Sequence, residues 1–128
     1  MGLMIPVSWG ELLDKLTILQ IKNERIESPG KLANIIKEYD ALDEIRRSRC
    51  QPSSELDRLV QELRLVNETL WEVEDAIREC EREKDFNSRF IELARSVYQT
   101  NDRRAHLKYL INDLLGSDLI EEKSYEEY

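Results

Sequence analysis

The sequence contains few of the residues that form disulfides, metal centres and phosphate-binding loops. Its 128 residues include two cysteines, one histidine, four glycines and three prolines. Two cysteines make no disulfide framework, which suits a reducing compartment, and the single histidine, His106, lacks the partners of a zinc site or a catalytic triad. No glycine-rich phosphate loop occurs. The scarcity of glycine and proline favours long helices.

The chain also lacks a long apolar run and an excess of positive charge. No stretch approaches the roughly 20 apolar residues that cross a membrane, and Met1–Val7 has no basic region typical of a secretory signal. The net charge of −8 disfavours nucleic acid and anionic lipid as partners. We therefore expect a cytoplasmic protein that binds neither nucleic acid nor membrane.

Charge is distributed unevenly along the chain. Residues 52–85 carry 5 basic and 11 acidic side chains, whereas residues 86–116 carry 5 basic and 3 acidic ones. Residues 117–128 carry 1 basic and 5 acidic side chains. We expect the acidic helix to lie against the more basic one. The pattern predicts a single helical domain over residues 1–116 and an acidic, flexible tail over residues 117–128.

A heptad of apolar residues is the strongest pattern that the sequence contains. Successive members of the repeat are separated alternately by four and three residues. They are Leu59, Leu63, Val66, Leu70, Val73, Ile77 and Cys80, and Leu56 extends the repeat by one step at its start. Such a stripe allows one helix to pack lengthwise on another with coiled-coil-like contacts.

Capping residues and breakers divide the chain into four helices. Ser8 and Glu11 form a capping box, Ser28 and Ser54 stand where caps are expected, and Gly116 suits a helix end. The predicted helices cover residues 9–27, 29–49, 55–84 and 89–115. The expected fold class is therefore all-α, dominated by a long antiparallel hairpin of the third and fourth helices.

The first helix is apolar on more than one side, and the third helix is longer than its neighbours. A helix with several apolar faces is either central in a bundle or shared with a second subunit. The part of the third helix that the first two helices cannot reach is available for another chain. We expect a homo-oligomer, most simply a homodimer.

The fourth helix is interrupted by five polar residues, Thr100 to Arg104. Five residues exceed one helical turn, so some of them must face the packed side of the helix. Arg104 falls on that side in both possible registers. A buried guanidinium must meet a carboxylate, a ligand or water, because leaving it unpaired is costly.

Other polar residues are expected at the same level of the bundle. In an antiparallel hairpin, residues 101–104 lie opposite residues 68–71, which predicts a polar layer of Asn23, Asn67, Glu68, Asn101, Asp102 and Arg104. The candidate binding residues are Lys15, Lys22, Asn23, Asn67, Glu68, Trp71, Asn101, Asp102, Arg104 and Lys108.

This polar layer has two interpretations. It can fix the register and oligomeric state of the bundle, or it can accept an anionic group or the acidic segment of a partner protein. Trp71 lies outside the seam and needs cover from a helix, another chain or a ligand. The preferred function is a non-enzymatic binding or assembly role without a cofactor.

Carboxylate pairs at helical spacing support an alternative function. Glu11 with Asp14, and Asp40 with Asp43, are such pairs, and the main candidate metal ligands are Glu68, Glu72, Asp75 and Glu79. Carboxylates three or four residues apart can bind Mg²⁺. Similar pairs serve all-α nucleotide pyrophosphohydrolases. The alternative is therefore Mg²⁺-dependent hydrolysis of a nucleotide or phosphate ester, which requires several carboxylates to converge.

Three segments carry a family resemblance. Residues 5–22 read IPVSWGELLDKLTILQIK, residues 28–42 read SPGKLANIIKEYDAL, and residues 97–125 read VYQTNDRRAHLKYLINDLLGSDLIEEKSY. Together they resemble a family of small uncharacterised bacterial proteins, a domain of unknown function. The resemblance implies a self-standing bacterial domain and brings no established activity or catalytic residue.

Overall fold

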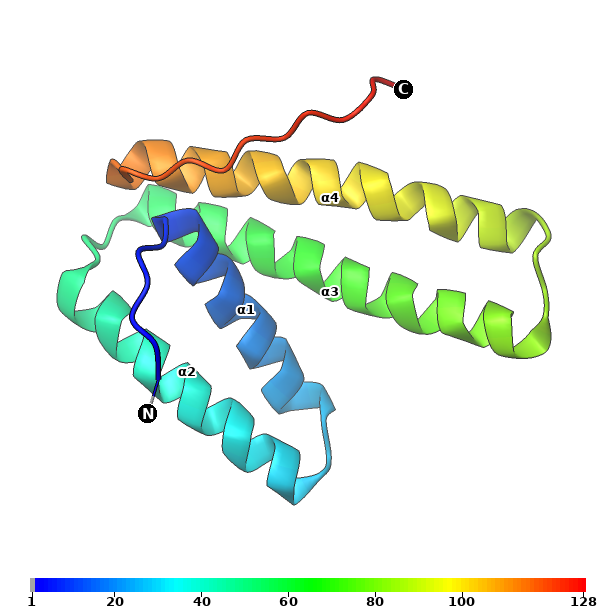
Figure 1. Cartoon of the computed structure of the whole chain (residues 1–128), viewed down its shortest axis with the longest axis horizontal. Coiled ribbons are helices and arrows are strands. Elements are labelled where there is room, and N and C mark those ends of the chain that lie inside the picture. Colours follow the sequence, from blue (N-terminus) through cyan, green and yellow to red (C-terminus); the bar gives the residue numbers. More distant parts are fainter. Residues whose placement is uncertain (1) are drawn as a thin grey trace.

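A computed structural model describes residues 2–128 and contains four helices. They are α1 (Trp9–Arg25), α2 (Pro29–Arg49), α3 (Ser54–Glu83) and α4 (Ser88–Leu115) (Figure 1). No strand occurs within the described residues. The predicted all-α class is confirmed, and α3 and α4 form the expected antiparallel hairpin.

Side-chain caps define the starts of α1 and α3. The Ser8 hydroxyl accepts a hydrogen bond from the backbone N–H of Glu11 at 3.1 Å, as the capping box predicts. At α3 the predicted cap is wrong by one residue. Ser53 is the N-cap, and its hydroxyl accepts the N–H of Leu56 at 3.1 Å, whereas Ser54 is the first helical residue.

The remaining helix ends follow local backbone chemistry. Ser28 is at the N-cap of α2 but makes no side-chain cap hydrogen bond. Pro29 fills the first turn, where a missing N–H costs nothing. Gly116 ends α4 with φ of 64°, a left-handed conformation that glycine adopts without strain. Helix α1 stops at Arg25, two residues before the predicted end.

The core lies where α1 meets the hairpin. Helix α1 packs against each of the other helices, whereas α2 packs on α1 at the edge of the bundle. The largest buried apolar cluster comprises Leu12, Leu13, Leu16, Leu56, Leu59, Leu63, Val66, Leu107 and Ile111. Burial of each large apolar side chain contributes about 1.5–3 kcal/mol. This cluster therefore fixes the first half of α1 against α3 and α4.

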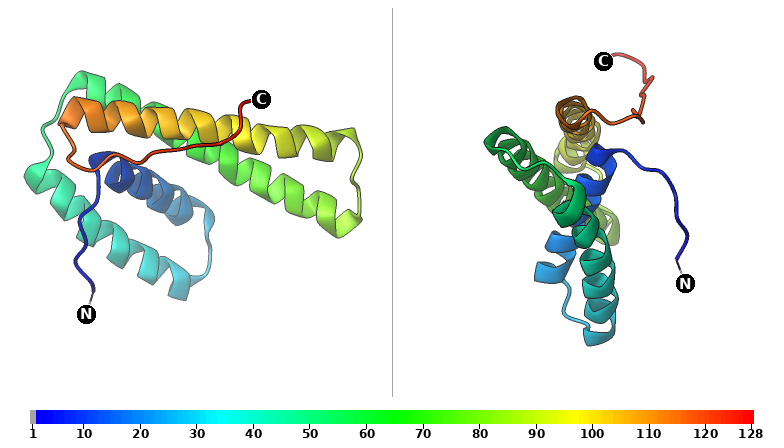
Figure 2. Two further views of the ribbon diagram at one scale, coloured as in Figure 1. Left: turned by 45° about the horizontal axis from the view of Figure 1, so that its top comes forward. Right: turned by 90° about the vertical axis from the view of Figure 1, so that its left-hand side faces the viewer.

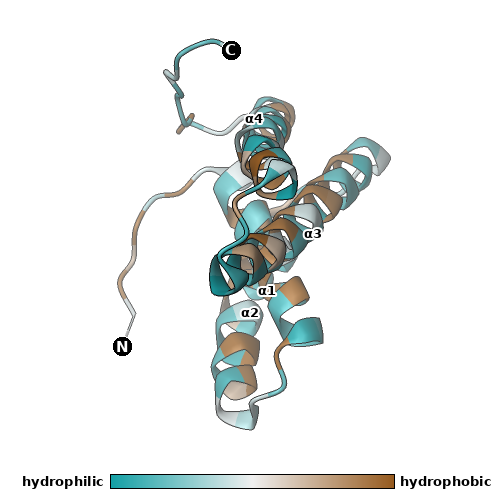
Figure 3. Ribbon diagram, turned by 90° about the vertical axis from the view of Figure 1, so that its right-hand side faces the viewer, coloured by the Kyte–Doolittle hydropathy of each residue, from teal (hydrophilic) through white to brown (hydrophobic). Residues whose placement is uncertain are grey.

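The hairpin extends beyond the other two helices. Helices α1 and α2 diverge from it, so the second half of α3 and the first half of α4 form an arm (Figure 1). Along the heptad of α3, Leu59, Leu63, Val73 and Cys80 are buried, whereas Leu70 and Ile77 are only partly buried. Apolar stretches follow the hairpin along both helices (Figure 3). Among residues 2–128, none of the four helices contains an apolar segment of the length that spans a bilayer.

Residues 117–128 follow α4 without forming a helix or strand. The tail turns back at Gly116 and runs beside α4, on the side away from α2 (Figure 2). A segment that is acidic in sequence therefore lies against the more basic of the two long helices. This placement creates the site described next.

Candidate functional site

Asp14 is the centre of a polar network inside the bundle. Its side chain lies on α1 between α3 and α4, and the residue is only 1% exposed. Arg104 of α4 donates to it with two nitrogens, Nε to Oδ1 at 2.9 Å and Nη2 to Oδ2. Asn67 of α3 donates from Nδ2 to the same Oδ1 at 2.9 Å. Two-point pairing of a guanidinium with a carboxylate fixes direction as well as energy.

Thr17 completes this Asp14 network. Its hydroxyl accepts a hydrogen bond from Asn67 Nδ2 at 2.9 Å and donates to the backbone carbonyl of Asp14 at 2.7 Å. Within residues 2–128, no buried side-chain nitrogen or oxygen lacks a hydrogen-bond partner. A fully satisfied buried network specifies how its helices pack, because any shift would leave a polar group unpaired.

Lys108 binds carboxylates from two parts of the chain. It is 8% exposed, and its Nζ lies 2.8 Å from Glu11 Oε2 on α1 and 2.9 Å from Glu121 Oε2 on the tail. Asp14 Oδ2 is 4.0 Å away. Burial lowers the pKa of Lys108. The hydrogen bonds with Glu11 and Glu121 and the negative charge of Asp14 together raise it by more than burial lowers it, so the net shift of the pKa is upward. Lys108 is therefore a cation at neutral pH.

The backbones of α1 and α4 approach closely beside this lysine. Gly10 N–H donates to Asn112 Oδ1 at 2.7 Å, and Trp9 N–H donates to Ser117 Oγ at 2.9 Å. A Cβ at position 10 would stand 2.6 Å from the carbonyl oxygen of Lys108. Only glycine fits there, so Gly10 allows the start of α1 to lie on α4.

A cavity of about 850 Å³ lies next to the Asp14 network, between α4 and the tail. Its lining residues are Val97, Tyr98, Asn101, Asp102, Arg104, Ala105, Lys108, Glu121, Lys123, Tyr125, Glu126, Glu127 and Tyr128. The Arg104 side chain is 28% exposed, and its Nη1 donates to no protein atom among residues 2–128. The hydrogen bonds that Arg104 donates to Asp14 raise the pKa of Arg104, so the cavity wall carries a permanent guanidinium.

The tail closes the cavity through polar and aromatic contacts. Glu121 reaches Lys108, and the Tyr128 hydroxyl donates to Asp102 Oδ2 at 2.6 Å. The rings of Tyr98 and Tyr128 meet edge to face with centroids 5.0 Å apart. Hydrogen bonds from Lys123 and Lys108 lower the pKa of Glu121 to about 2.

The structure brings together some of the predicted site residues. Asn67 and Arg104 share Asp14, and Lys108 lies beside them. Asn101 and Asp102 line the cavity rather than the buried network. The buried network and the cavity thus meet at Arg104 and Lys108, which face both.

Other members of the predicted polar layer lie elsewhere. Glu68 pairs with Arg64 of its own helix at 2.9 Å, so it does not neutralise Arg104. Asn23 is exposed near the end of α1, and the Asp102 carboxylate accepts a hydrogen bond from Tyr128 instead of pairing with Arg104. The prediction of one layer containing these three residues is therefore wrong.

The predicted lysines of α1 and the tryptophan of α3 also lie outside the network. Lys15 is exposed and forms an ion pair with Glu38 of α2 at 3.0 Å. Lys22 is partly buried on α1 and does not line the cavity. Trp71 is partly buried on the arm of the hairpin. These three residues do not contribute to the site at Arg104.

Sequence reasoning missed the central role of Asp14, together with Gly10 and Asn112. A signal for Asp14 was present, because it is a charged residue in a helix that is apolar on several sides. Asp14 stands next to Leu13 and two residues before Leu16, so burial of these apolar residues can bury the carboxylate as well, and it then needs a cation. Gly10 was a weaker signal, since a glycine in the first turn of a helix lowers stability unless a close approach requires it.

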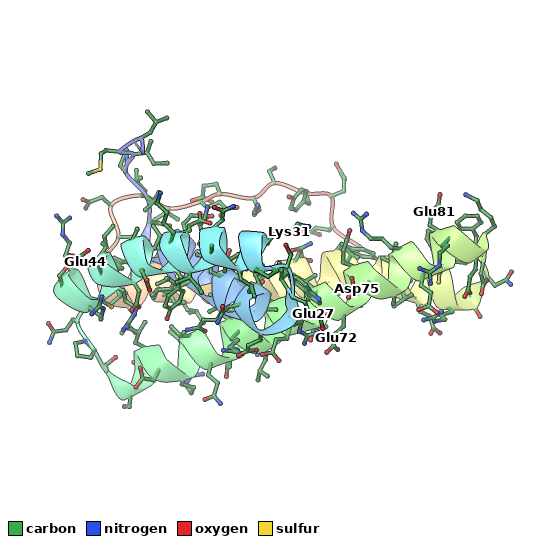
Figure 4. The ribbon with its side chains drawn as sticks, turned by 90° about the horizontal axis from the view of Figure 1, so that it is seen from below. Glu27, Lys31, Glu44, Glu72, Asp75 and Glu81 are labelled. Carbon is green, nitrogen blue, oxygen red and sulfur yellow. The ribbon has the colours of Figure 1, made fainter. Side chains whose placement is uncertain are left out.

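The carboxylates of the magnesium alternative do not converge. Glu72 Oε1 lies 3.3 Å from Arg25 Nη2, and Glu79 Oε2 lies 3.9 Å from Arg89 Nη2, so each carboxylate pairs with an arginine. Glu72 and Asp75 are exposed on α3 (Figure 4). No group of three histidine, cysteine, aspartate or glutamate residues that could hold a metal ion occurs in residues 2–128. The expectation that these helical pairs form one ligand set is not met.

Comparisons with known proteins identify a family but no activity. A family model described as a family of unknown function, DUF6165, matches residues 3–128. No curated protein and no solved structure matches the chain.

Proposed function

The chain belongs to DUF6165, a family whose description names no activity, and we propose from the site alone that it is a non-enzymatic binding protein. The cavity beside Arg104 and Lys108 is the proposed binding site. Its ligand is an anionic group, carried by a small molecule or by a partner protein. The contact between the Glu121 carboxylate of the tail and the Lys108 ammonium is the observation that carries this proposal.

Lys108 supports the proposal because it already binds a carboxylate that is separable from the bundle. Glu11 holds one side of the ammonium from within α1, while Glu121 approaches from the irregular tail. An external carboxylate or phosphate placed where Glu121 lies would make the same charge-assisted hydrogen bond. Burial of the lysine strengthens that bond, because solvent screens a buried charge less.

Arg104 supports the same site from the neighbouring turn of α4. Asp14 holds Nε and Nη2 in place, so the planar guanidinium is fixed before any ligand arrives. Its Nη1 can donate to an oxygen of an anionic ligand with little further loss of side-chain entropy. Asn101 adds a neutral amide to the cavity wall. The ionisable groups here pair with one another, an arrangement that suits recognition more than proton transfer.

A thermal-shift titration tests the proposal. The probes are inorganic phosphate and citrate, added to the full chain and to Lys108→Gln. The matched control is Lys31→Gln, which removes the same charge from an exposed position on α2. We expect both anions to raise the melting temperature of the unmodified chain and of Lys31→Gln, because ligand binding to the native state stabilises it. An equal rise in Lys108→Gln would overturn the proposal.

The assembly part of the proposal concerns the arm of the hairpin. We propose a homodimer in which the continuing heptad of α3 makes coiled-coil contacts with a second copy. Leu65 and Ile91 are exposed on α3 and α4, and the end of the arm extends beyond α1 and α2. Sedimentation velocity tests this: a monomer across a wide concentration range would contradict it. We also propose a bacterial, cytoplasmic setting. Both cysteines are free thiols, which suits a reducing compartment.

A further inference from the structure

The tail is attached to α4 at two separate points. Glu121 binds Lys108, and seven residues later Tyr128 meets Tyr98 and Asp102. Between the anchors the chain is extended and exposed, and Tyr128 itself is 77% exposed. The exposed contacts of Tyr128 contribute about 0–1 kcal/mol each. Lys108 is buried, but it keeps its contact with Glu11 of α1 when the tail leaves.

The spacing of the two anchor points fits an extended peptide. Tyr98 and Lys108 are ten residues apart on α4, or about 15 Å at 1.5 Å per residue. Seven residues of extended chain span at most about 25 Å, so the tail reaches both points without strain. A single small anion can satisfy Lys108 but cannot reach the tyrosine. The site as built therefore recognises a carboxylate and a phenol along one strand.

We propose that residues 118–128 are a tethered ligand, which occupies the cavity that an acidic, tyrosine-containing segment of a partner protein binds. This inference rests on the proposed function, because it assigns the ligand class of the same site. The partner segment is extended and carries a glutamate or aspartate for Lys108. A tyrosine about seven residues further on meets Tyr98 and Asp102. The tail competes with that segment and so lowers its apparent affinity.

The tether sets how strong this competition is. A segment joined by a short linker is present at an effective concentration in the millimolar range. The apparent dissociation constant for a peptide in trans rises in inverse proportion to the fraction of molecules whose cavity is open. Weakening the tail anchors must therefore strengthen binding in trans. A purely structural tail would give no such gain.

The test uses the full chain and a labelled peptide with the sequence of residues 117–128, SDLIEEKSYEEY. Fluorescence anisotropy compares the unmodified chain with the double variant Glu121→Gln, Tyr128→Ala. We expect the double variant to bind the peptide at least about tenfold more tightly, since its own tail no longer competes. Far-UV circular dichroism checks that its helices are retained.

Two matched controls define the contact. In the first control, a peptide with the same two changes should bind the double variant at least about tenfold more weakly than the unchanged peptide does. In the second, Lys108→Gln is added to the double variant, and the affinity for the unchanged peptide should fall by at least about tenfold. Equal affinity of the unmodified chain and the double variant, or equal affinity of both peptides, would overturn the tethered-ligand inference. Lys108-dependent stabilisation by phosphate would still support the proposed function in that case. Loss of both responses would refute both.

Discussion

The buried carboxylate of Asp14 gives the sharpest prediction for stability. Asp14→Asn keeps the size of the side chain and removes its charge. Arg104 then loses its ion pair. The new asparagine has a single acceptor oxygen, for which Asn67 and Arg104 must compete. Removing one partner of a buried ion pair costs about 3–5 kcal/mol. Because the Arg104 side chain is 28% exposed, water in the cavity can solvate part of its charge, so we expect a loss of about 2–3 kcal/mol.

Urea unfolding followed by circular dichroism measures this loss. The control is Glu74→Gln, which removes an exposed carboxylate paired with Arg78 at 2.8 Å and should cost less than about 0.5 kcal/mol. The double variant Asp14→Asn, Arg104→Gln should lose less than the sum of its single variants, because the pair acts as a unit. A loss for Asp14→Asn equal to that of the control would refute the role of the network.

Three further predictions concern the backbone contact, the tail and a helix cap. Gly10→Ala should lower the free energy of unfolding by about 1–3 kcal/mol, because the added Cβ would meet the backbone of α4. In the control Gly30→Ala, the added Cβ meets nothing within 4 Å, so the free energy of unfolding should rise by up to about 1 kcal/mol. Urea unfolding measures both, and equal effects would contradict the close approach at Gly10. The lowered pKa of Glu121 means that its contact stabilises the docked tail fully above about pH 4.5 and is lost as the pH falls toward about 2. Carboxyl NMR shifts measure that titration, and a midpoint near 4.5 would show an unpaired side chain. Ser53→Ala should destabilise α3 by about 1 kcal/mol in thermal unfolding, and a larger effect of Ser54→Ala would place the cap elsewhere.

The helices were predictable from the sequence because their signals are local. The heptad, the capping box at Ser8 and the terminal glycine of α4 each depend on residues within a turn or two. The bounds of α2 match the prediction, and those of α1, α3 and α4 differ by one or two residues. At α3 the cap was predicted at Ser54, and the structure places it at the adjacent Ser53.

The partner of Arg104 was not predictable in the same way. Counting residues around the hairpin placed Glu68 and Asp102 near it, but that count ignores α1. The angle at which α1 crosses the hairpin brings Asp14 to the guanidinium and takes Asn23 away from it. Gly10 allows α1 to approach α4 closely at this crossing, and hydrophobic periodicity does not encode such a contact. The residue that must be neutralised could be identified, but not the carboxylate that does so.

The tail shows the same division between composition and position. Its acidic character is evident from the sequence, and it predicts attraction to the basic part of α4. Which glutamate reaches Lys108 depends on the turn at Gly116 and on the path of the chain along α4. The prediction of a flexible tail is untested by these contacts.

The most direct test of the proposed binding site is an NMR titration of the full chain with inorganic phosphate. Arginine side-chain Nε–H signals and backbone amides report where the anion binds. We predict that the Arg104 Nε–H and the amides of residues 98–108 shift first, together with those of the tail as Glu121 is displaced. Shifts spread over all basic residues, or centred on α2, would contradict binding at Arg104 and Lys108.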